Sequence, residues 1–178
     1  MLSICIGDGR VSVQSLSAGS ADVLFGDAFG AEAVPWHLTT VEFTREVRRV
    51  LRPSGLYVLN AIDSGPNRFV KAEVRTIAAV FRYVVVMAPP YAFAGEFGAN
   101  FIIVASDKPI NEMALRAGIT TRGTDAIILG GEVRTVRSGR AAYGLPAALR
   151  NFAARSGSAP TLLTDDFAPV DQLFTRTG

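Results

Sequence analysis

Three aspartates, Asp8, Asp27 and Asp63, each follow a short apolar run of the sequence. Runs of this kind are typical of buried strands in a parallel sheet, and ligands bind just outside the carboxyl ends of such strands. A carboxylate there can accept a hydrogen bond from an adenine amino group or a ribose hydroxyl, orient a cationic amine, or take its proton. Aspartate also begins turns and caps helices, so each one alone has a structural explanation. Three aspartates at equivalent ends of predicted strands favour a ligand site.

Other reactive side chains are few, because Cys5 and His37 are the only cysteine and the only histidine. One cysteine cannot form an internal disulfide. We expect Cys5 to be a buried strand residue, with a nucleophile as the alternative, since a catalytic thiol needs a nearby base. We expect His37 to be a hydrogen-bonded loop residue, with a general base as the alternative. No metal site is predicted.

The order of segments predicts strands that alternate with helices. Five apolar runs are expected to be strands, at residues 2–6, 22–25, 56–62, 83–87 and 101–106. One helix is expected to begin near Thr39, which has capping-box spacing to Glu42, and to end before Pro53. A second runs from Pro66 to Phe81. Apolar strands alternating with helices indicate a mostly parallel sheet covered on both faces.

The last two predicted strands are joined by residues 89–100, which lack a helical period and indicate a hairpin. A mostly parallel sheet with an antiparallel last strand is typical of the Rossmann-like, methyltransferase-type α/β fold. We expect residues 1–110 to form a partial domain of this type. Residues 111–178 are expected to form an irregular, mostly helical extension that packs on it.

Composition excludes several classes of protein. The 178 residues are 49% hydrophobic and 19% charged, which excludes a disordered chain. The formal net charge is only +2 and the arginines are scattered, so nucleic acid is not an expected partner. The apolar runs are far shorter than the roughly 20 residues that cross a membrane. The first residues lack the features of a signal peptide, so we expect a cytoplasmic protein.

Four segments carry a family resemblance: Gly-Asp-Gly-Arg at 7–10, Asp-Val-Leu-Phe-Gly-Asp at 22–27, Leu-Arg-Pro-Ser-Gly-Leu-Tyr-Val-Leu-Asn at 51–60, and Leu-Thr-Asp-Asp-Phe-Ala-Pro-Val-Asp at 163–171. Together they resemble the spermidine synthase (polyamine aminopropyltransferase) family, especially its bacterial spermidine-synthase-like branch. The third segment is shared with many methyltransferases, and the ordered set carries the resemblance.

The resemblance implies transfer of an aminopropyl group from decarboxylated S-adenosylmethionine to an amine, which leaves methylthioadenosine. Asp8 would accept a hydrogen bond from the adenine amino group, and Gly9 would allow close approach. Asp27 would be the catalytic carboxylate that receives the proton of the amine. No covalently bound cofactor is implied.

The resemblance also implies an amine site under a flap formed by residues 28–38. Trp36 would be an apolar wall for a methylene chain, and Glu32 would bind the distal ammonium. Asp165 and Asp166 lie in the fourth segment and would help to hold the amine, with capping of a terminal turn as the equal alternative.

The sequence departs from the family in two ways. Gly30 replaces a second aspartate expected three residues after Asp27, which argues against putrescine as the acceptor. The chain also lacks the N-terminal part of the family, with its glycine-rich first strand and ribose-binding acid, so the N-terminally truncated fold would be inactive alone.

The second departure leaves an edge of the predicted sheet open. In the methyltransferase strand order 3-2-1-4-5-7-6, loss of strands 1 and 2 exposes the strand at 22–25. Either residues 2–6 pair with it or two chains meet there as a homodimer. A non-catalytic, self-associating Rossmann-like module and an S-adenosylmethionine-dependent methyltransferase are the alternative functions.

Overall fold

The computed structural model describes residues 4–29, 34–121, 125–132, 134–136, 142–144, 149, 151–152 and 162–173. The strands are β1 (Ala21–Gly26), β2 (Leu51–Asp63), β3 (Tyr83–Ala88), β4 (Ala99–Ser106), β5 (Ile127–Glu132), β6 (Arg134–Val136) and β7 (Ala142–Gly144). The helices are α1 (Gly9–Ser15), α2 (Val41–Val50), α3 (Arg68–Ala78), α4 (Pro90–Ala94), α5 (Glu112–Thr121) and α7 (Val170–Leu173), with a 3-10 turn, η1 (Trp36–Leu38).

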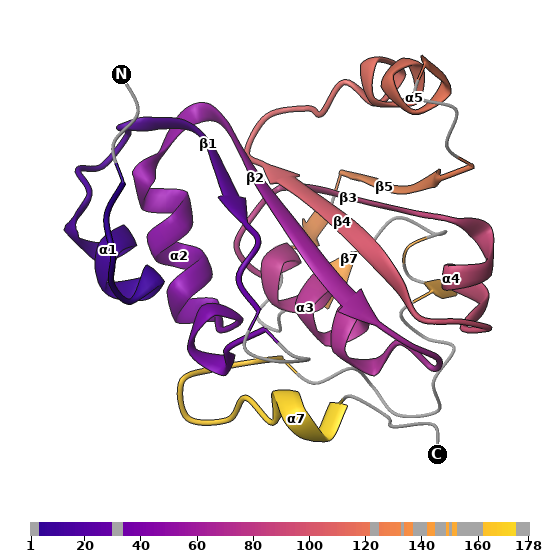
Figure 1. Ribbon diagram of the computed structural model, residues 1–178. Coiled ribbons are helices and arrows are strands. Elements are labelled where there is room, and N and C mark those ends of the chain that lie inside the picture. Colours follow the sequence, from indigo (N-terminus) through magenta and orange to yellow (C-terminus); the bar gives the residue numbers. More distant parts are fainter. Residues whose placement is uncertain are drawn as a thin grey trace.

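Five strands form one mixed sheet in the order β1-β2-β4-β3-β5 (Figure 1). β1 and β2 are parallel, and β4 runs antiparallel to both β2 and β3. The predicted α/β class, the methyltransferase-type order of these four strands and the hairpin of the last two are therefore confirmed. β5 adds a further antiparallel strand beside β3.

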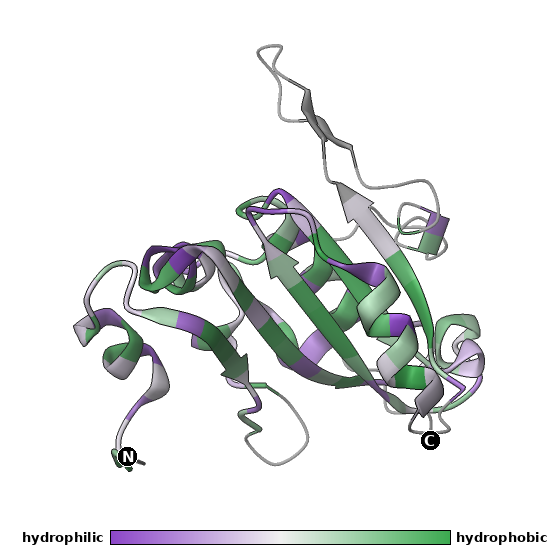
Figure 2. Cartoon of the chain, turned by 90° about the horizontal axis from the view of Figure 1, so that it is seen from above, coloured by the Kyte–Doolittle hydropathy of each residue, from purple (hydrophilic) through white to green (hydrophobic). Residues whose placement is uncertain are grey.

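The two faces of the sheet carry separate apolar clusters. Successive residues of a strand point to opposite faces. Tyr57 and Leu59 of β2 belong to the larger cluster, which α2 and α3 cover, while Leu56 and Val58 face the smaller cluster beside α5. The hydropathy colouring shows apolar residues along the central strands (Figure 2). The face shared with α2 and α3 is the main core.

Helix α2 forms where the sequence predicts it, with its cap one residue later. Thr40 is the N-cap, and its hydroxyl accepts a hydrogen bond of 3.2 Å from the backbone N–H of Phe43. The Thr39 hydroxyl donates instead to the carbonyl of Trp36 and closes η1. Glu42 accepts from the backbone N–H of Asp165, so the predicted capping box is wrong.

The predicted first strand is wrong in its described part. Residues 4–8 form no strand, and the side chains of Ile4 and Ile6 are 81% and 101% exposed. Cys5 is exposed, whereas the sequence predicts that it is buried. An apolar run becomes a buried strand only when a neighbouring strand pairs with it, and here the run leads directly into α1. Residues 4–6 therefore do not cover the edge of β1, which pairs only with β2 in the described part.

Two further segments differ from expectation. Residues 89–100 contain the short helix α4, which has Pro90 in its first turn and ends at Gly95 with φ 77°. The segment after residue 110 contains three strands besides its helices, and β5 extends the main sheet. The position of β5 depends on its pairing with β3, a strand far away in the sequence. The division of the chain at residue 110 stays a prediction.

The β1 end of the smaller apolar face is bare in the described residues. Val23 and Phe25 stand opposite Leu56 and Val58 in the register of β1 and β2, and 41% and 73% of their respective surfaces are exposed. Helix α5 contacts the opposite end of the sheet, at β5. None of the helices in this described part is long and apolar enough to cross a membrane.

Candidate functional site

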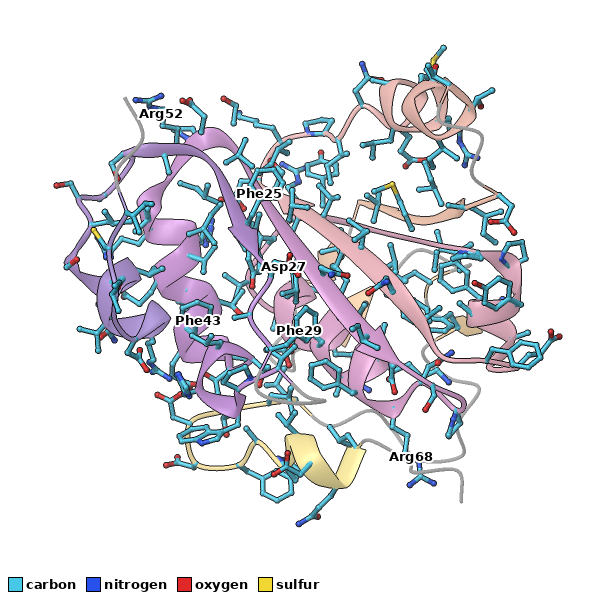
Figure 3. All side chains as sticks on the ribbon, in the orientation of Figure 1. Phe25, Asp27, Phe29, Phe43, Arg52 and Arg68 are labelled. Atoms are coloured by element: carbon cyan, nitrogen blue, oxygen red, sulfur yellow. The ribbon has the colours of Figure 1, made fainter. Side chains whose placement is uncertain are left out.

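Asp27 lies directly after β1, at the carboxyl ends of the parallel strands β1 and β2 (Figure 3). Its side chain is exposed, and its Oδ1 accepts a hydrogen bond of 2.9 Å from Nδ2 of Asn60 on β2. Oδ1 of the same Asn60 amide is buried without a hydrogen-bond partner. The exposed Asp27 carboxylate is the acceptor that an N–H donor of a ligand can reach here, whereas the Asn60 oxygen is buried.

Sequence reasoning gave no role to Asn60. The residue belongs to the strand segment that carries the resemblance, but an asparagine near the end of a strand is no signal by itself. Its importance depends on the parallel pairing of β1 with β2, which brings its amide to Asp27.

Asp8 is the N-cap of α1 and does not follow a strand in the described residues. Its Oδ1 accepts hydrogen bonds of 2.8 Å and 3.0 Å from the backbone N–H groups of Arg10 and Val11. Its Oδ2 lies 3.1 Å from Nε2 of His37. The N–H of Val11, followed by that of Arg10 and the imidazole, holds the pKa of Asp8 below its usual range. Asp8 is thus a charged acceptor that already has partners.

A cavity of about 130 Å³ connects the start of α1 with the end of β1. Gly9 and Asp27 both line it, so the structure brings these two predicted site residues together. Most of the other lining residues are apolar: Val13, Leu24, Phe25, Val34, Leu38, Phe43, Tyr57 and Leu59. A Cβ atom on Gly9 would meet only Leu38, at an ordinary distance of 3.8 Å, so packing does not require glycine there.

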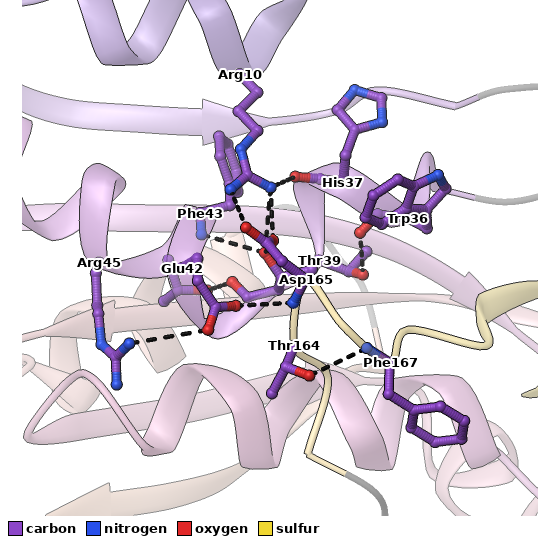
Figure 4. A network of polar contacts seen from close by, with 12 residues as sticks. Arg10, Trp36, His37, Thr39, Glu42, Phe43, Arg45, Thr164, Asp165 and Phe167 are labelled. Carbon is purple, nitrogen blue, oxygen red and sulfur yellow. Dashed lines mark hydrogen bonds and ion pairs between the residues drawn. The ribbon is translucent and has the colours of Figure 1, made fainter.

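Asp165 is held by protein groups (Figure 4). Its two carboxylate oxygens accept hydrogen bonds of 2.7 Å and 2.5 Å from the guanidinium of Arg10, and Oδ1 also accepts one of 2.7 Å from the Thr40 hydroxyl. Arg10, followed by Thr40, keeps the pKa of Asp165 below its usual range. This fastens the C-terminal segment to α1 and α2. Asp166 is exposed. A role for either residue in holding an amine stays a prediction.

Trp36 lies in η1, beside a hollow of about 260 Å³. The hollow is lined on one side by Val34, Pro35 and Trp36 and on the other by residues 168–172 of the C-terminal segment. The indole is 51% exposed and makes an edge contact with the His37 ring, with 5.8 Å between centroids. Glu32, the other residue predicted in this loop, lies outside the described residues.

Four titratable side chains are buried in the described residues: Asp63, Glu73, Tyr57 and Lys71, whose Nζ donates a hydrogen bond of 2.6 Å to the Pro66 carbonyl. Asp63, the third aspartate of the sequence pattern, is buried at the end of β2 and accepts from the backbone N–H groups of Ser64 and Val70. Burial nevertheless raises its pKa to about 6. Glu73 on α3 is fully buried, neither of its oxygens has a hydrogen-bond partner, and burial raises its pKa far above the usual range. Burial also raises the pKa of Tyr57, and nearby Glu73 adds to the rise.

A cavity of about 980 Å³ lies away from these carboxylates, at the opposite end of β2. Arg48 and Arg52 line it, and each is paired, with Asp107 and Asp22 at 2.6 Å. The carbonyl ends of α2 and α3 meet there, and Arg82 and Lys108 also line the cavity. Within the described ranges, no group of three or more His, Cys, Asp and Glu side chains is placed to hold a metal ion.

No protein-family model matches the chain, and a comparison with curated proteins finds no match. Among solved structures, it is similar to a "probable spermidine synthase" from Corynebacterium glutamicum, with 27% sequence identity and a TM-score of 0.70. That match covers 93% of this chain and 55% of the other, so the chain spans about half the length of that protein. A spermidine synthase in complex with the transition-state analogue AdoDATO matches 60% of this chain and 36% of its own, with 23% identity and a TM-score of 0.50. Over part of their length, the fold of this chain is therefore similar to the fold of spermidine synthases.

Proposed function

We propose that the chain is spermidine-synthase-like and carries the amine half of an aminopropyl-transfer site, with decarboxylated S-adenosylmethionine as donor and an amine as acceptor. The observation that carries the proposal is Asp27, an exposed carboxylate at the carboxyl ends of β1 and β2, which accepts a hydrogen bond of 2.9 Å from the Asn60 amide. The fold similarity to spermidine synthases supports it.

The reaction needs an unprotonated amine. An alkylamine has a pKa of about 10, so it arrives protonated at neutral pH and needs a base within about 3 Å. Asp27 takes that proton, and Asn60 holds its carboxylate in place. The nitrogen lone pair then forms the N–C bond while the C–S bond breaks. The electron pair of the C–S bond stays on sulfur, which becomes the neutral thioether of methylthioadenosine.

The nucleoside of the donor is assigned to Asp8 and Gly9. Asp8 offers a charged acceptor for the adenine amino group, although His37 and two backbone N–H groups share it. Gly9 has no side chain, and the space beside it is not filled by close packing, since a Cβ atom there would meet only Leu38 at an ordinary distance. Because the chain spans about half of its C. glutamicum neighbour, we expect binding to be measurable where turnover by the chain alone is not.

Calorimetric titration with methylthioadenosine, decarboxylated S-adenosylmethionine and S-adenosylmethionine tests the proposal. We expect the first two to bind and Asp8→Ala to abolish binding, while Glu96→Gln, an exposed control, binds normally. If turnover is measurable, Asp27→Asn lowers it by about 100-fold and leaves nucleoside affinity unchanged. Binding of S-adenosylmethionine alone would favour a methyltransferase, and no heat with any of the three would reject the donor site.

The bare edge of the sheet supports a second candidate, a non-catalytic module that acts by self-association. β1 is an edge strand, and the exposed Val23 and Phe25 lie on the uncovered face next to it. We propose a homodimer through this edge. Light scattering should then give the mass of a dimer, and Phe25→Lys should give a monomer. Phe97→Lys is the matched control, because Phe97 is also exposed, at 68%, but lies near α4. A wild-type monomer would exclude this association.

A further inference from the structure

We propose that the cavity at the amino end of β2 binds a ligand that carries several phosphate groups, either a nucleoside triphosphate or an inorganic oligophosphate. The cavity has a volume of about 980 Å³ and lies at the opposite end of β2 from the Asp27 site. Figure 3 shows Arg52, one of its lining residues, at the start of β2 and away from Asp27. The inference goes beyond the proposed function and does not depend on it.

Cationic side chains outnumber acidic ones in the lining of this cavity. Among the described residues, the cationic members are Arg48, Arg52, Arg82 and Lys108, and the acidic member is Asp107. Asp107 pairs with Arg48, and Asp22, outside the lining, pairs with Arg52. Lys108 takes part in none of the ion pairs between described residues. A lining of this charge attracts anions.

The guanidinium groups of Arg48 and Arg52 keep donors for a ligand. Arg48 uses only Nε for Asp107, and Arg52 uses only Nη1 for Asp22. Their other N–H groups have no hydrogen-bond partner among the described residues. Arg49, which does not line the cavity, instead donates through Nε, Nη1 and Nη2 to Glu46 and to carbonyls at the end of α1. The unused N–H groups of a guanidinium fork suit phosphate oxygens.

The two ion pairs at the cavity do not block a phosphate ligand. The side chains of Arg48 and Arg52 are 52% and 50% exposed, and exposed ion pairs contribute little to stability. A phosphate group carries up to two negative charges, so it attracts a guanidinium more strongly than a single carboxylate does. The ligand can therefore share each arginine with its aspartate or replace that aspartate.

The carbonyl ends of α2 and α3 also lie at this cavity, and a helix carries a partial negative charge at that end. Most of this charge is already met by backbone donors. The N–H groups of residues 19 and 20 donate to the carbonyls of Arg49 and Val50, at the end of α2. The N–H of Phe81 donates to the carbonyl of Ile77, in the last turn of α3. The full charges of the arginine and lysine side chains therefore outweigh the helix dipoles.

The size of the cavity suits a ligand larger than a single phosphate ion. Its volume of about 980 Å³ lies within the range of about 300–1,000 Å³ that is usual for small-molecule sites. Leu51, Pro53 and Val80 add apolar surface beside the cations. A chain of phosphate groups, with or without a nucleoside, fits this lining.

Calorimetric titration with tripolyphosphate and with ATP, at low salt and without divalent metal ions, tests the proposal. We expect saturable binding of both probes, with an affinity that falls as salt is added. Tighter binding of ATP assigns the site to a nucleotide, and equal affinities assign it to the phosphate chain alone. If neither probe binds in a saturable way, the proposal is rejected.

Three variants make the test specific. Arg48→Gln and Lys108→Gln should each weaken the affinity for tripolyphosphate by about three- to fivefold, as expected for the loss of an exposed ion pair. Arg45→Gln is the matched control, because Arg45 is exposed on the same helix as Arg48 but does not line the cavity. This control removes the same charge and should bind like the wild type.

Two outcomes with these variants would overturn the assignment, provided that circular dichroism shows all three to be folded. Equal losses in Arg45→Gln, Arg48→Gln and Lys108→Gln would mean that the overall charge of the protein attracts the probe. An affinity that neither Arg48→Gln nor Lys108→Gln changes would place the probe outside this cavity.

Discussion

Carboxyl groups occupy two contrasting environments in this molecule. At the carboxyl end of the sheet, Asp8 and Asp165 accept hydrogen bonds from several donors, and these donors lower their pKa values. Inside the molecule, Glu73 has no hydrogen-bond partner and Asp63 accepts from backbone N–H groups, with Lys71 as a nearby positive charge, and burial raises both pKa values. Hydrogen-bond donors thus favour the charged carboxylate at the exposed carboxyl end of the sheet, which we call the rim. Burial favours the neutral carboxyl group in the core.

The difference indicates which carboxylates can serve a cationic ligand. A carboxylate that binds a cationic ligand must be reachable from solvent, and Asp27 is exposed. Burial of a core carboxyl such as Glu73 costs desolvation free energy. A ligand cannot contact this side chain, because solvent does not reach it. The proposed site therefore uses exposed carboxylates, whereas the interior acids bear on stability.

The strongest test of this contrast is Glu73→Leu. Removal of an unpartnered buried carboxyl should stabilise the protein by about 1–3 kcal/mol at pH 8, the cost of burying a polar group without hydrogen bonds. Because the folded pKa is raised, the wild type loses stability as pH rises above the unfolded value of about 4.3. The gain in the variant should therefore shrink as pH falls toward 4.

Urea denaturation at several pH values measures this effect, with Glu96→Gln as an exposed control that should leave stability unchanged. A gain that does not vary with pH would mean that Glu73 is not neutral in the folded protein. Destabilisation at every pH would mean that its side chain has a partner.

Arg10→Ala probes the rim and should have a smaller effect, of the opposite sign. It removes the guanidinium that holds Asp165 and donates 3.1 Å to the His37 carbonyl. We expect a loss of about 1–2 kcal/mol at pH 7, since the pair is charge-assisted but partly exposed. The lowered pKa makes the contribution of Asp165 full above its usual value of 3.8, and it is lost as pH falls below that value.

Thermal unfolding between pH 3 and pH 7 measures the loss. Arg45→Ala is the matched control, because Arg45 is exposed and lies 3.9 Å from Glu42. If both variants are equally stable at pH 7, the Arg10 network does not fasten the C-terminal segment.

The sequence predicts those parts of the fold that local pattern decides. α2 has a threonine cap and a buried apolar face, and β1, β2 and the β3–β4 hairpin are strongly apolar between turn residues. The failures depend on neighbours far along the chain. Residues 4–6 have the composition of a strand but no partner, and β5 lies at an edge that sequence order does not reveal.

The candidate site divides in the same way. The position of Asp27 follows from a strand end and is predictable. The contact of Asn60 with Asp27 needs the strand register, and the pairing of Arg10 with Asp165 joins residues at opposite ends of the sequence. The sequence pattern puts Asp8 after a strand, whereas in the structure it is the N-cap of α1, the structural role that aspartate commonly has.

The smallest expected effect concerns Thr40, a buried residue that is in contact with an exposed carboxylate. Its hydroxyl caps α2 through the buried N–H of Phe43 and donates to the exposed carboxylate of Asp165. We expect Thr40→Ala to cost about 1 kcal/mol, the usual value of a lost N-cap, and Thr40→Ser to cost less because it keeps the oxygen. A double-mutant cycle with Asp165→Ala, measured by urea denaturation, separates the two contacts. Coupling of more than about 0.5 kcal/mol means that the cap and the rim network act together, whereas additive losses mean that Thr40 serves α2 alone.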